Sequence, residues 1–404
     1  MLIIYFNEDI SVISDNSWKV KRNDAFVDSP LYPPNYRLPE YSIYYDARKD
    51  LGDWINEAYN TSVWENATEY AVGGEGVYGK LYPRGIPFLK DYGLKDYENS
   101  KDYENYTVNK LFGEKITVDI PYNAQITPYL KIIAPAGKKI RITTENTLIG
   151  AVSTTYITKE GEQEFEALGW FNGEHITYKI PKGVTVVSLK YRETGYDSSF
   201  SGDFVRGDEF LDSLWQKSLR TLYVTMRDNY MDCPDRERAQ WWGDVVVELG
   251  EAGYLFDERA HLLTRKAILE LMNWQQPNGV IASPVPGWYK SELPCQMLAS
   301  VGYYGFQTYY MLTGDSQTIA DIYPRVRKYL FEVWEPQNSG LVKVRRGGWY
   351  WGDWGTNIDK PALQQCWYAV ALRGYAKMAR LTGHNRDAMW AEQMLDKMSY
   401  EFDK

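Results

Sequence analysis

The spacing at which apolar residues repeat along the chain changes near residue 206, and this change constrains the fold more than any other feature of the sequence. Before it, short runs rich in β-branched and aromatic residues are separated by Gly, Pro, Asn and Asp turns, as in 115–120 and 184–191. After it, apolar residues recur at the spacing of one helix face, as in 211–226 and 363–381. We therefore expect a multidomain chain in which N-terminal antiparallel β-sandwiches are followed by an all-α domain.

A helix-stop signal that occurs twice indicates how the helices are arranged. Leu312-Thr313-Gly314-Asp315 and Leu381-Thr382-Gly383-His384 each place a glycine where a helix ends, and an aspartate in the first copy stands where the next helix would be capped. A stop that recurs at equivalent points is typical of stacked αα-hairpins. We expect seven helices, near 208–229, 241–254, 258–274, 294–313, 315–333, 361–382 and 386–402.

The sequence predicts three domains. Residues 1–78 form an accessory β-sandwich that begins partway into its fold, and residues 79–205 form a second β-sandwich. The glycine-rich stretch 72–76 is expected to be the hinge between them. Residues 206–404 form the helical domain.

Charge and composition exclude several classes of function. A net charge of -9 argues against a nucleic-acid partner, because phosphates demand a basic surface. Three cysteines and three histidines form no metal-ligand pattern, so we expect no metal and no cofactor. No apolar run approaches the length of a membrane span, so no membrane partner is expected. The first residues lack the basic segment of a signal peptide, and localisation stays open, with a periplasmic or secreted location favoured over a cytoplasmic one.

The segment 230–244 holds the residues that can carry chemistry. It contains four carboxylates, two arginines and two indoles. Carboxylates accept hydrogen bonds from sugar hydroxyls, indole faces cover the apolar side of a pyranose, and a protonated carboxyl can act as general acid on a glycosidic oxygen. Because Cys233-Pro234 disfavours a helix, Glu237 is expected in a connection before a helix that starts near Trp241. The alternative is a solvated charged loop with a local arginine–carboxylate network.

The pattern Asp-Cys-Pro-Asp-Arg-Glu-Arg followed by Trp-x-Gly-Asp, at 232–244, resembles the signature of glycoside hydrolase family 78, the α-L-rhamnosidases. The stretches 15–20 and 45–48 resemble the accessory sandwich of the same family. This resemblance implies a carbohydrate substrate, hydrolysis with inversion, and an (α/α)6 catalytic barrel whose N-terminal half is 206–404. It also implies, by position, that Glu237 is the general acid and that the rhamnose is bound by Asp232, Arg236, Trp241 and Asp244.

Two further loops add candidate sugar-binding residues. The loop 345–355 has four glycines and three indoles around one carboxylate, which favours a sugar-binding rim. Its Gly-Asp-Trp at 352–354 resembles a pocket segment of the family, so Trp351, Asp353 and Trp354 are predicted to line the site, with Trp354 in the same concave wall as the acid. The loop 284–294 carries Trp288 and Glu292, which the sequence leaves open between pocket wall and plain surface.

The charges next to the acid candidate lead to two more expectations. Glu237 must be protonated near neutral pH to act as an acid, so Arg236 and Arg238 are expected to point toward other carboxylates. Glu248 and Glu251 follow Asp244 on one helical face without basic partners at helical spacing, and we expect them to be solvated.

An inverting enzyme also needs a second carboxylate as base. The family's base is a glutamate on later helices of a twelve-helix barrel, so we expect these 404 residues to be a fragment or truncated gene product that holds the acid half of the site. Glu292 and Asp353 are the candidates within the chain that could stand in. The alternatives are a catalytically inactive carbohydrate-binding relative, another (α/α)6 glycosidase, or a polysaccharide lyase, and release of an aryl α-L-rhamnoside distinguishes turnover from binding.

Overall fold

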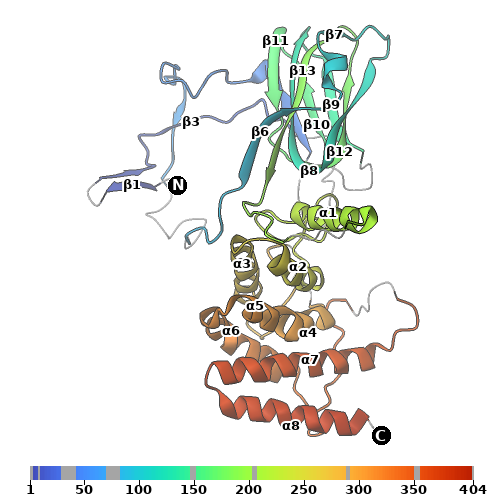
Figure 1. Ribbon diagram of the computed structural model, residues 1–404. Helices are drawn as coiled ribbons and strands as arrows, with labels where there is room; N and C mark the ends of the chain where they lie inside the picture. Colours follow the sequence, from blue (N-terminus) through green and yellow to red (C-terminus); the bar gives the residue numbers. More distant parts are fainter. Residues whose placement is uncertain are drawn as a thin grey trace.

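The computed structural model describes residues 3–7, 10–28, 42–69, 82–145, 152–202, 207–287, 292–349 and 355–402. A β-sandwich lies at one end, and the helices are stacked beneath it in layers, with the last helix farthest from the sandwich (Figure 1). The predicted order, β-rich first and helical second, is confirmed. Within these ranges, no helix has both the length and the apolar character needed to cross a membrane.

Nine strands form the main sheet, in the order β4-β10-β9-β12-β8-β13-β6, with β11 paired to β8 and β7 paired to β13. They are β4 (Ile43–Asp46), β6 (Lys90–Asp96), β7 (Tyr106–Thr107), β8 (Glu114–Ala134), β9 (Lys139–Thr144), β10 (Thr154–Ile157), β11 (Gly161–Glu166), β12 (Phe171–Ile180) and β13 (Thr185–Gly195). The pairs are antiparallel except for β4 with β10, which is parallel. Two small pairs lie outside this sheet, β1 (Ile3–Asn7) with β2 (Ile10–Ile13) and β3 (Lys19–Val20) with β5 (Glu65–Asn66).

β8 connects the two sets of strands in the sandwich. Its first part pairs with β12, whereas its second part pairs with β11 and β13. Alternate residues, such as Ile116, Val118 and Ile120, are buried in the core, and the residues between them face outward.

β4 belongs to the segment 1–78, yet it pairs with β10, so this segment contributes a strand to the larger sheet. The domain boundaries at 78 and 205 stay predictions, and the expected hinge at 72–76 lies outside the described residues.

The seven predicted helices are present in the described part of the chain, one of them in two pieces. They are α1 (Glu209–Val224), α2 (Trp242–Leu255), α3 (Arg259–Asn273), α4 (Pro294–Val301) continued by α5 (Thr308–Thr313), α6 (Ser316–Lys328), α7 (Lys360–Leu381) and α8 (Asn385–Phe402). π-helical turns at Tyr303–Gln307 and Tyr329–Val333 join α4 to α5 and extend α6.

The predicted helix stops are confirmed by backbone geometry. Gly314 ends α5 with φ 68°, and Asp315 caps α6 by accepting a hydrogen bond from the Thr318 amide at 3.0 Å. Gly383 has φ 81° directly after α7. The break after α4 was not predicted. It falls at Gly302, where α7 packs so closely that a Cβ on Gly374 would lie 2.6 Å from the Gly302 carbonyl carbon.

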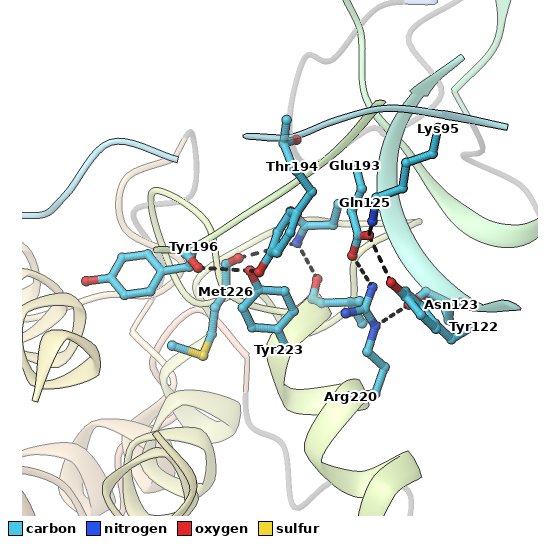
Figure 2. A network of polar contacts seen from close by, with 12 residues as sticks. Lys95, Tyr122, Asn123, Gln125, Glu193, Thr194, Tyr196, Arg220, Tyr223 and Met226 are labelled. Carbon is cyan, nitrogen blue, oxygen red and sulfur yellow. Dashed lines mark hydrogen bonds and ion pairs between the residues drawn. The ribbon is translucent and has the colours of Figure 1, made fainter. Parts of the chain in front are cut away.

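A buried ionic network joins the sandwich to α1 (Figure 2). Glu193 of β13 has a side chain only 2% exposed, and it accepts hydrogen bonds from Lys95 at 2.8 Å and from Arg220 of α1 at 2.7 Å. Gln125 of β8 donates to the Val224 carbonyl at the end of α1, at 2.7 Å. Burial by itself would raise the pKa of Glu193, but the hydrogen bonds from Lys95 and Arg220 outweigh it and hold this pKa below its ordinary value of 4.5. The network therefore contributes stability above pH 4.5 that is lost as the pH falls below that value.

We predict that Arg220→Ala lowers the free energy of unfolding by about 3 kcal/mol, because it leaves one oxygen of a buried carboxylate without its donor. Urea unfolding at pH 7 followed by tryptophan fluorescence measures the change. Arg380→Ala is the matched control: its ion pair with Glu392 is about half exposed on both sides, at 51% and 45%, and its loss should cost less than about 1 kcal/mol. Equal effects of the two substitutions would contradict the assignment of the network as a structural joint.

Candidate active site

The segment that carries the motif is a closed loop directly before α2. The Asp232 amide donates to the Ala239 carbonyl at 2.9 Å, and the Ala239 amide donates back to Asp232 Oδ1 at 3.1 Å. α2 begins at Trp242, so Glu237 lies in the connection before the helix, as predicted. The pairing of Asp232 with Ala239 fixes both ends of the loop.

Glu237 is buried, with 3% of its surface exposed. The Trp241 indole donates to Glu237 Oε2 at 2.6 Å, and the Arg236 guanidinium donates to Glu237 Oε1 at 2.7 Å. The expectation that Arg236 points toward another acid is therefore wrong. The physical reason is desolvation, since a buried carboxylate needs donors and Arg236, 61% exposed, can reach it from the solvent side.

Arg238 connects the loop to the sandwich. It has φ 49°, which is unusual for a residue with a Cβ. Its guanidinium lies 3.5 Å from the centre of the Trp170 ring and donates to the Trp170 carbonyl at 3.1 Å and to the Pro234 carbonyl at 2.7 Å. These contacts hold Arg238 against the sandwich, and its expected contact with a carboxylate stays a prediction.

The sandwich side of this contact was missed from the sequence. Trp170 immediately precedes β12, and Asn172 within β12 donates to Asp235 Oδ2 at 3.3 Å. Arg227, just after α1, also lies over the Trp170 ring, at 4.7 Å. No local pattern could have identified Trp170 or Asn172, because their partners lie more than sixty residues away in the sequence.

The acids of the motif and of α2 lie close enough together to perturb one another. Burial, followed by the charges of Glu237 and Asp244, raises the pKa of Asp232 to about 6. Asp244 lies exposed in the first turn of α2, where the helix dipole favours a negative charge. Together with Trp241 and Arg236, these residues lie close together, and that they form the wall of a sugar site with Trp354 stays a prediction.

Glu248 corrects another expectation. It is 8% exposed rather than solvated, and burial is the main cause that raises its pKa well above the ordinary value. Within the described part of the chain its Oε2 has no hydrogen-bond partner. Glu251, one turn further on, is exposed as expected. Helical spacing showed that the two share a face, but not that neighbouring elements cover Glu248.

Glu292 is held in a buried ion pair. Both of its oxygens accept hydrogen bonds from Arg345, the shortest at 2.7 Å, and Oε1 also accepts from the Tyr329 hydroxyl at 2.8 Å. The next residue, Leu293, packs with Ala239 and Trp241, which places this segment beside the motif loop. A role of Glu292 in sugar binding stays a prediction, and its contacts favour a structural task.

The loop 345–349 is anchored on the same residue. The Gly348 amide donates to the Glu292 carbonyl at 2.9 Å, and a Cβ on Gly347 would lie 2.4 Å from that oxygen. The start of the predicted rim therefore lies near the motif loop. The candidates beyond it, Trp351, Asp353 and Trp354, and also Trp288, lie outside the described residues, so their placement stays a prediction.

Residues 199–404 match the model of the bacterial alpha-L-rhamnosidase six-hairpin glycosidase domain. An alpha-L-rhamnosidase of Formosa agariphila is 26% identical over 235 residues, which are 53% of this chain and 23% of that protein.

Solved structures share the fold. An alpha-L-rhamnosidase from Dictyoglumus thermophilum superposes with a TM-score of 0.78 at 20% identity, over 98% of this chain and 44% of its own. The Streptomyces avermitilis alpha-L-rhamnosidase, solved with L-rhamnose, gives 0.75 at 18% identity, over 97% of this chain and 37% of its own. The chain thus spans less than half the length of these relatives. By its six-hairpin domain match it belongs to the bacterial α-L-rhamnosidases of glycoside hydrolase family 78.

Proposed function

We propose that this chain carries the acid half of an inverting α-L-rhamnosidase site that acts on terminal α-L-rhamnosides of glycans or glycosides. The observation that supports it most is the Glu237 carboxyl, buried in a closed loop and held 2.6 Å from the Trp241 indole nitrogen. L-rhamnose in the structure of the Streptomyces avermitilis relative supports the substrate class.

In the proposed reaction, Glu237 donates its proton to the glycosidic oxygen while the bond from that oxygen to the anomeric carbon breaks. Asp232 and Asp244 accept hydrogen bonds from rhamnose hydroxyls, and Trp241 covers an apolar side of the ring. The Arg236 guanidinium occupies Glu237 Oε1 in the structure, so it has to move for a glycosidic oxygen to approach that atom. Its exposed side chain can swing away when a sugar enters, without rearranging the core.

Water attacks the anomeric carbon from the opposite face and passes its proton to a base, which lies roughly 6.5 to 9.5 Å from the acid in inverting enzymes. Glu292 is a poor base because Arg345 and Tyr329 already bind both of its oxygens. Asp353, the other candidate within the chain, lies outside the described residues and does not match the family's base. We therefore propose that the base belongs to later helices of the barrel, since the described residues hold seven helices and six hairpins comprise twelve.

The same observations favour a second candidate for the chain as it stands, a carbohydrate-binding protein without turnover. Arg236 forms an ion pair with Glu237, and Glu292, one of the two candidate bases, forms an ion pair with Arg345. Both candidate functions predict that the chain binds rhamnose, but only the first predicts that it takes part in hydrolysis.

Assayed as it stands, the chain is expected to bind L-rhamnose but to release little nitrophenol from 4-nitrophenyl α-L-rhamnoside. Isothermal calorimetry measures the first and absorbance the second. Turnover comparable to that of a full-length relative would show that the base lies within these residues.

In a protein with all six hairpins, Glu237→Gln should lower kcat by roughly 10²- to 10⁴-fold on a rhamnoside with a poor leaving group, the usual contribution of a general acid. Rhamnose affinity should change little, because the amide keeps the shape of the carboxyl. Glu251→Gln, at an exposed glutamate of α2, is the control and should leave both quantities unchanged. Near-normal turnover of Glu237→Gln would remove it from the acid role.

Rhamnose affinity should fall as the pH drops through about 6, because Asp232 then becomes protonated. The loss is expected to be roughly tenfold, as when a charge-assisted hydrogen bond becomes a neutral one. Calorimetry between pH 5 and 8 measures it. Asp232→Asn should bind weakly with no step near pH 6, whereas Glu248→Gln should keep the step. A step that survives in Asp232→Asn would assign it to another group.

A further inference from the structure

A row of positive charges crosses three neighbouring strands of the sandwich. Lys179 of β12 lies directly opposite Lys115 of β8 on one side and Arg141 of β9 on the other. Side chains at such positions lie about 4.5 to 5.5 Å apart at their Cβ atoms, and like charges directly opposite destabilise a sheet. All three residues are exposed, so the sheet places them in one row at a cost.

Two further lysines, Lys139 and Lys182, are exposed at the same end of these strands. We call these five residues, Lys115, Lys139, Arg141, Lys179 and Lys182, the basic face. Within the described ranges none of the five forms an ion pair. Some other lysines of the sandwich do, such as Lys131 with Glu162 and Lys190 with Asp96, whereas Lys138 and Lys159 form no ion pair within the described residues. What distinguishes the basic face, in a chain of net charge -9, is that three of its positive side chains lie directly opposite one another without a neutralising partner within the described residues.

The basic face borders a hollow of about 490 Å³. Ligand sites typically measure about 300 to 1,000 Å³. One wall is the loop with Leu111 and Phe112, whose side chains are 74% and 98% exposed. Gly113, at φ 78°, lets this loop lie against β12, because a Cβ there would meet the Ile180 carbonyl oxygen at 2.6 Å. Glu114 also lines the hollow, but Lys110 and Tyr106 bind its carboxylate.

The row next to the basic row is made of threonines, of which Thr117 and Thr143 are partly exposed, whereas Thr177 is buried and shares a hydrogen bond with Thr117. Thr117, Thr177 and Thr143 lie opposite one another in the neighbouring row of the same face. Strand β12 spans the sandwich from the helical side toward this end (Figure 1). Trp170, which directly precedes it, contacts Arg238. At about 3.3 Å per residue, the ten residues of β12 span roughly 30 Å. The hollow and the motif loop are therefore separate, and they lie near opposite ends of the same strand, β12.

We propose that the basic face binds an anionic polysaccharide, with carboxylate or sulfate groups of the glycan against the lysine and arginine side chains and a sugar ring against Phe112. The row of positive charges accounts for an anion, while the exposed ring of Phe112 accounts for a glycan. The choice of a glycan among polyanions rests on the proposed function. The site holds a polymer by its charged units while a rhamnosyl end reaches the motif loop.

Affinity electrophoresis and calorimetry at low salt test this with four polymers: polygalacturonate, dextran sulfate, neutral dextran and duplex DNA. At least one of the two anionic glycans should bind. Binding of polygalacturonate would identify carboxylate as the recognised group, and binding of dextran sulfate would identify sulfate. Binding should weaken as salt is raised, because the charges are exposed. Neutral dextran should not bind. Failure of both anionic glycans, or DNA binding as tight as theirs, would overturn the proposal.

The triple variant Lys115→Gln, Arg141→Gln and Lys179→Gln should weaken the anionic glycan roughly tenfold, and its Tm should not fall, because like charges have been removed. The control triple is Lys217→Gln, Arg373→Gln and Lys397→Gln, which removes the same charge from exposed helical positions and should change binding less than about twofold. Equal weakening by both triples would show a general charge effect and refute the site. The assay detects polymer binding without hydrolysis, so its failure leaves the rhamnosidase proposal standing, and a failure of the Glu237 test leaves this one standing.

Discussion

The contact between the Trp170 indole and the Arg238 guanidinium joins the two halves of the molecule at the residue next to the acid candidate. Arg238 has a left-handed backbone conformation, at φ 49°. Such a conformation costs energy and persists only where several contacts from the surrounding structure hold the backbone in it. Here the surroundings come from the sandwich, through the ring at 3.5 Å and the Trp170 carbonyl. The path of the loop, and with it the direction of Glu237, therefore depends on a residue that precedes a strand of the sandwich.

Two pairs of acids in the described residues contrast with each other. Glu193 and Glu292 each meet an arginine and a second donor, and they fasten elements together. Asp232 and Glu248 have pKa values that burial and neighbouring negative charges raise. Perturbed groups gathered at one place are typical of functional sites. A neutral ligand with several hydroxyl groups, such as the proposed sugar, can donate hydrogen bonds to the carboxylate oxygens of these acids without adding charge.

Charge is also segregated along the sandwich. β12 starts beside the acidic motif loop and ends in the basic face. The cross-strand repulsion at Lys179 is tolerated because the sheet is held by its other face, where Ile176, Tyr178 and Ile180 are almost fully buried. A buried face of this kind fixes the register of the strands, and the register then puts Lys115 and Arg141 on either side of Lys179.

The sequence by itself determined what depends on neighbouring residues. Apolar residues repeat every 2 residues in strands and every 3.6 residues in helices, and this spacing sets the type of each element. Gly314 and Gly383 end helices because their backbones adopt positive φ angles. Cys233-Pro234 keeps the motif out of a helix. Long-range packing decided the rest. The spacing of Glu248 specified a face but not what covers it, and nothing near Trp170 in the sequence indicated Arg238 as its partner. Burial and ion pairing are properties of elements brought together from distant parts of the chain, so the electrostatics of the site came from the tertiary structure alone.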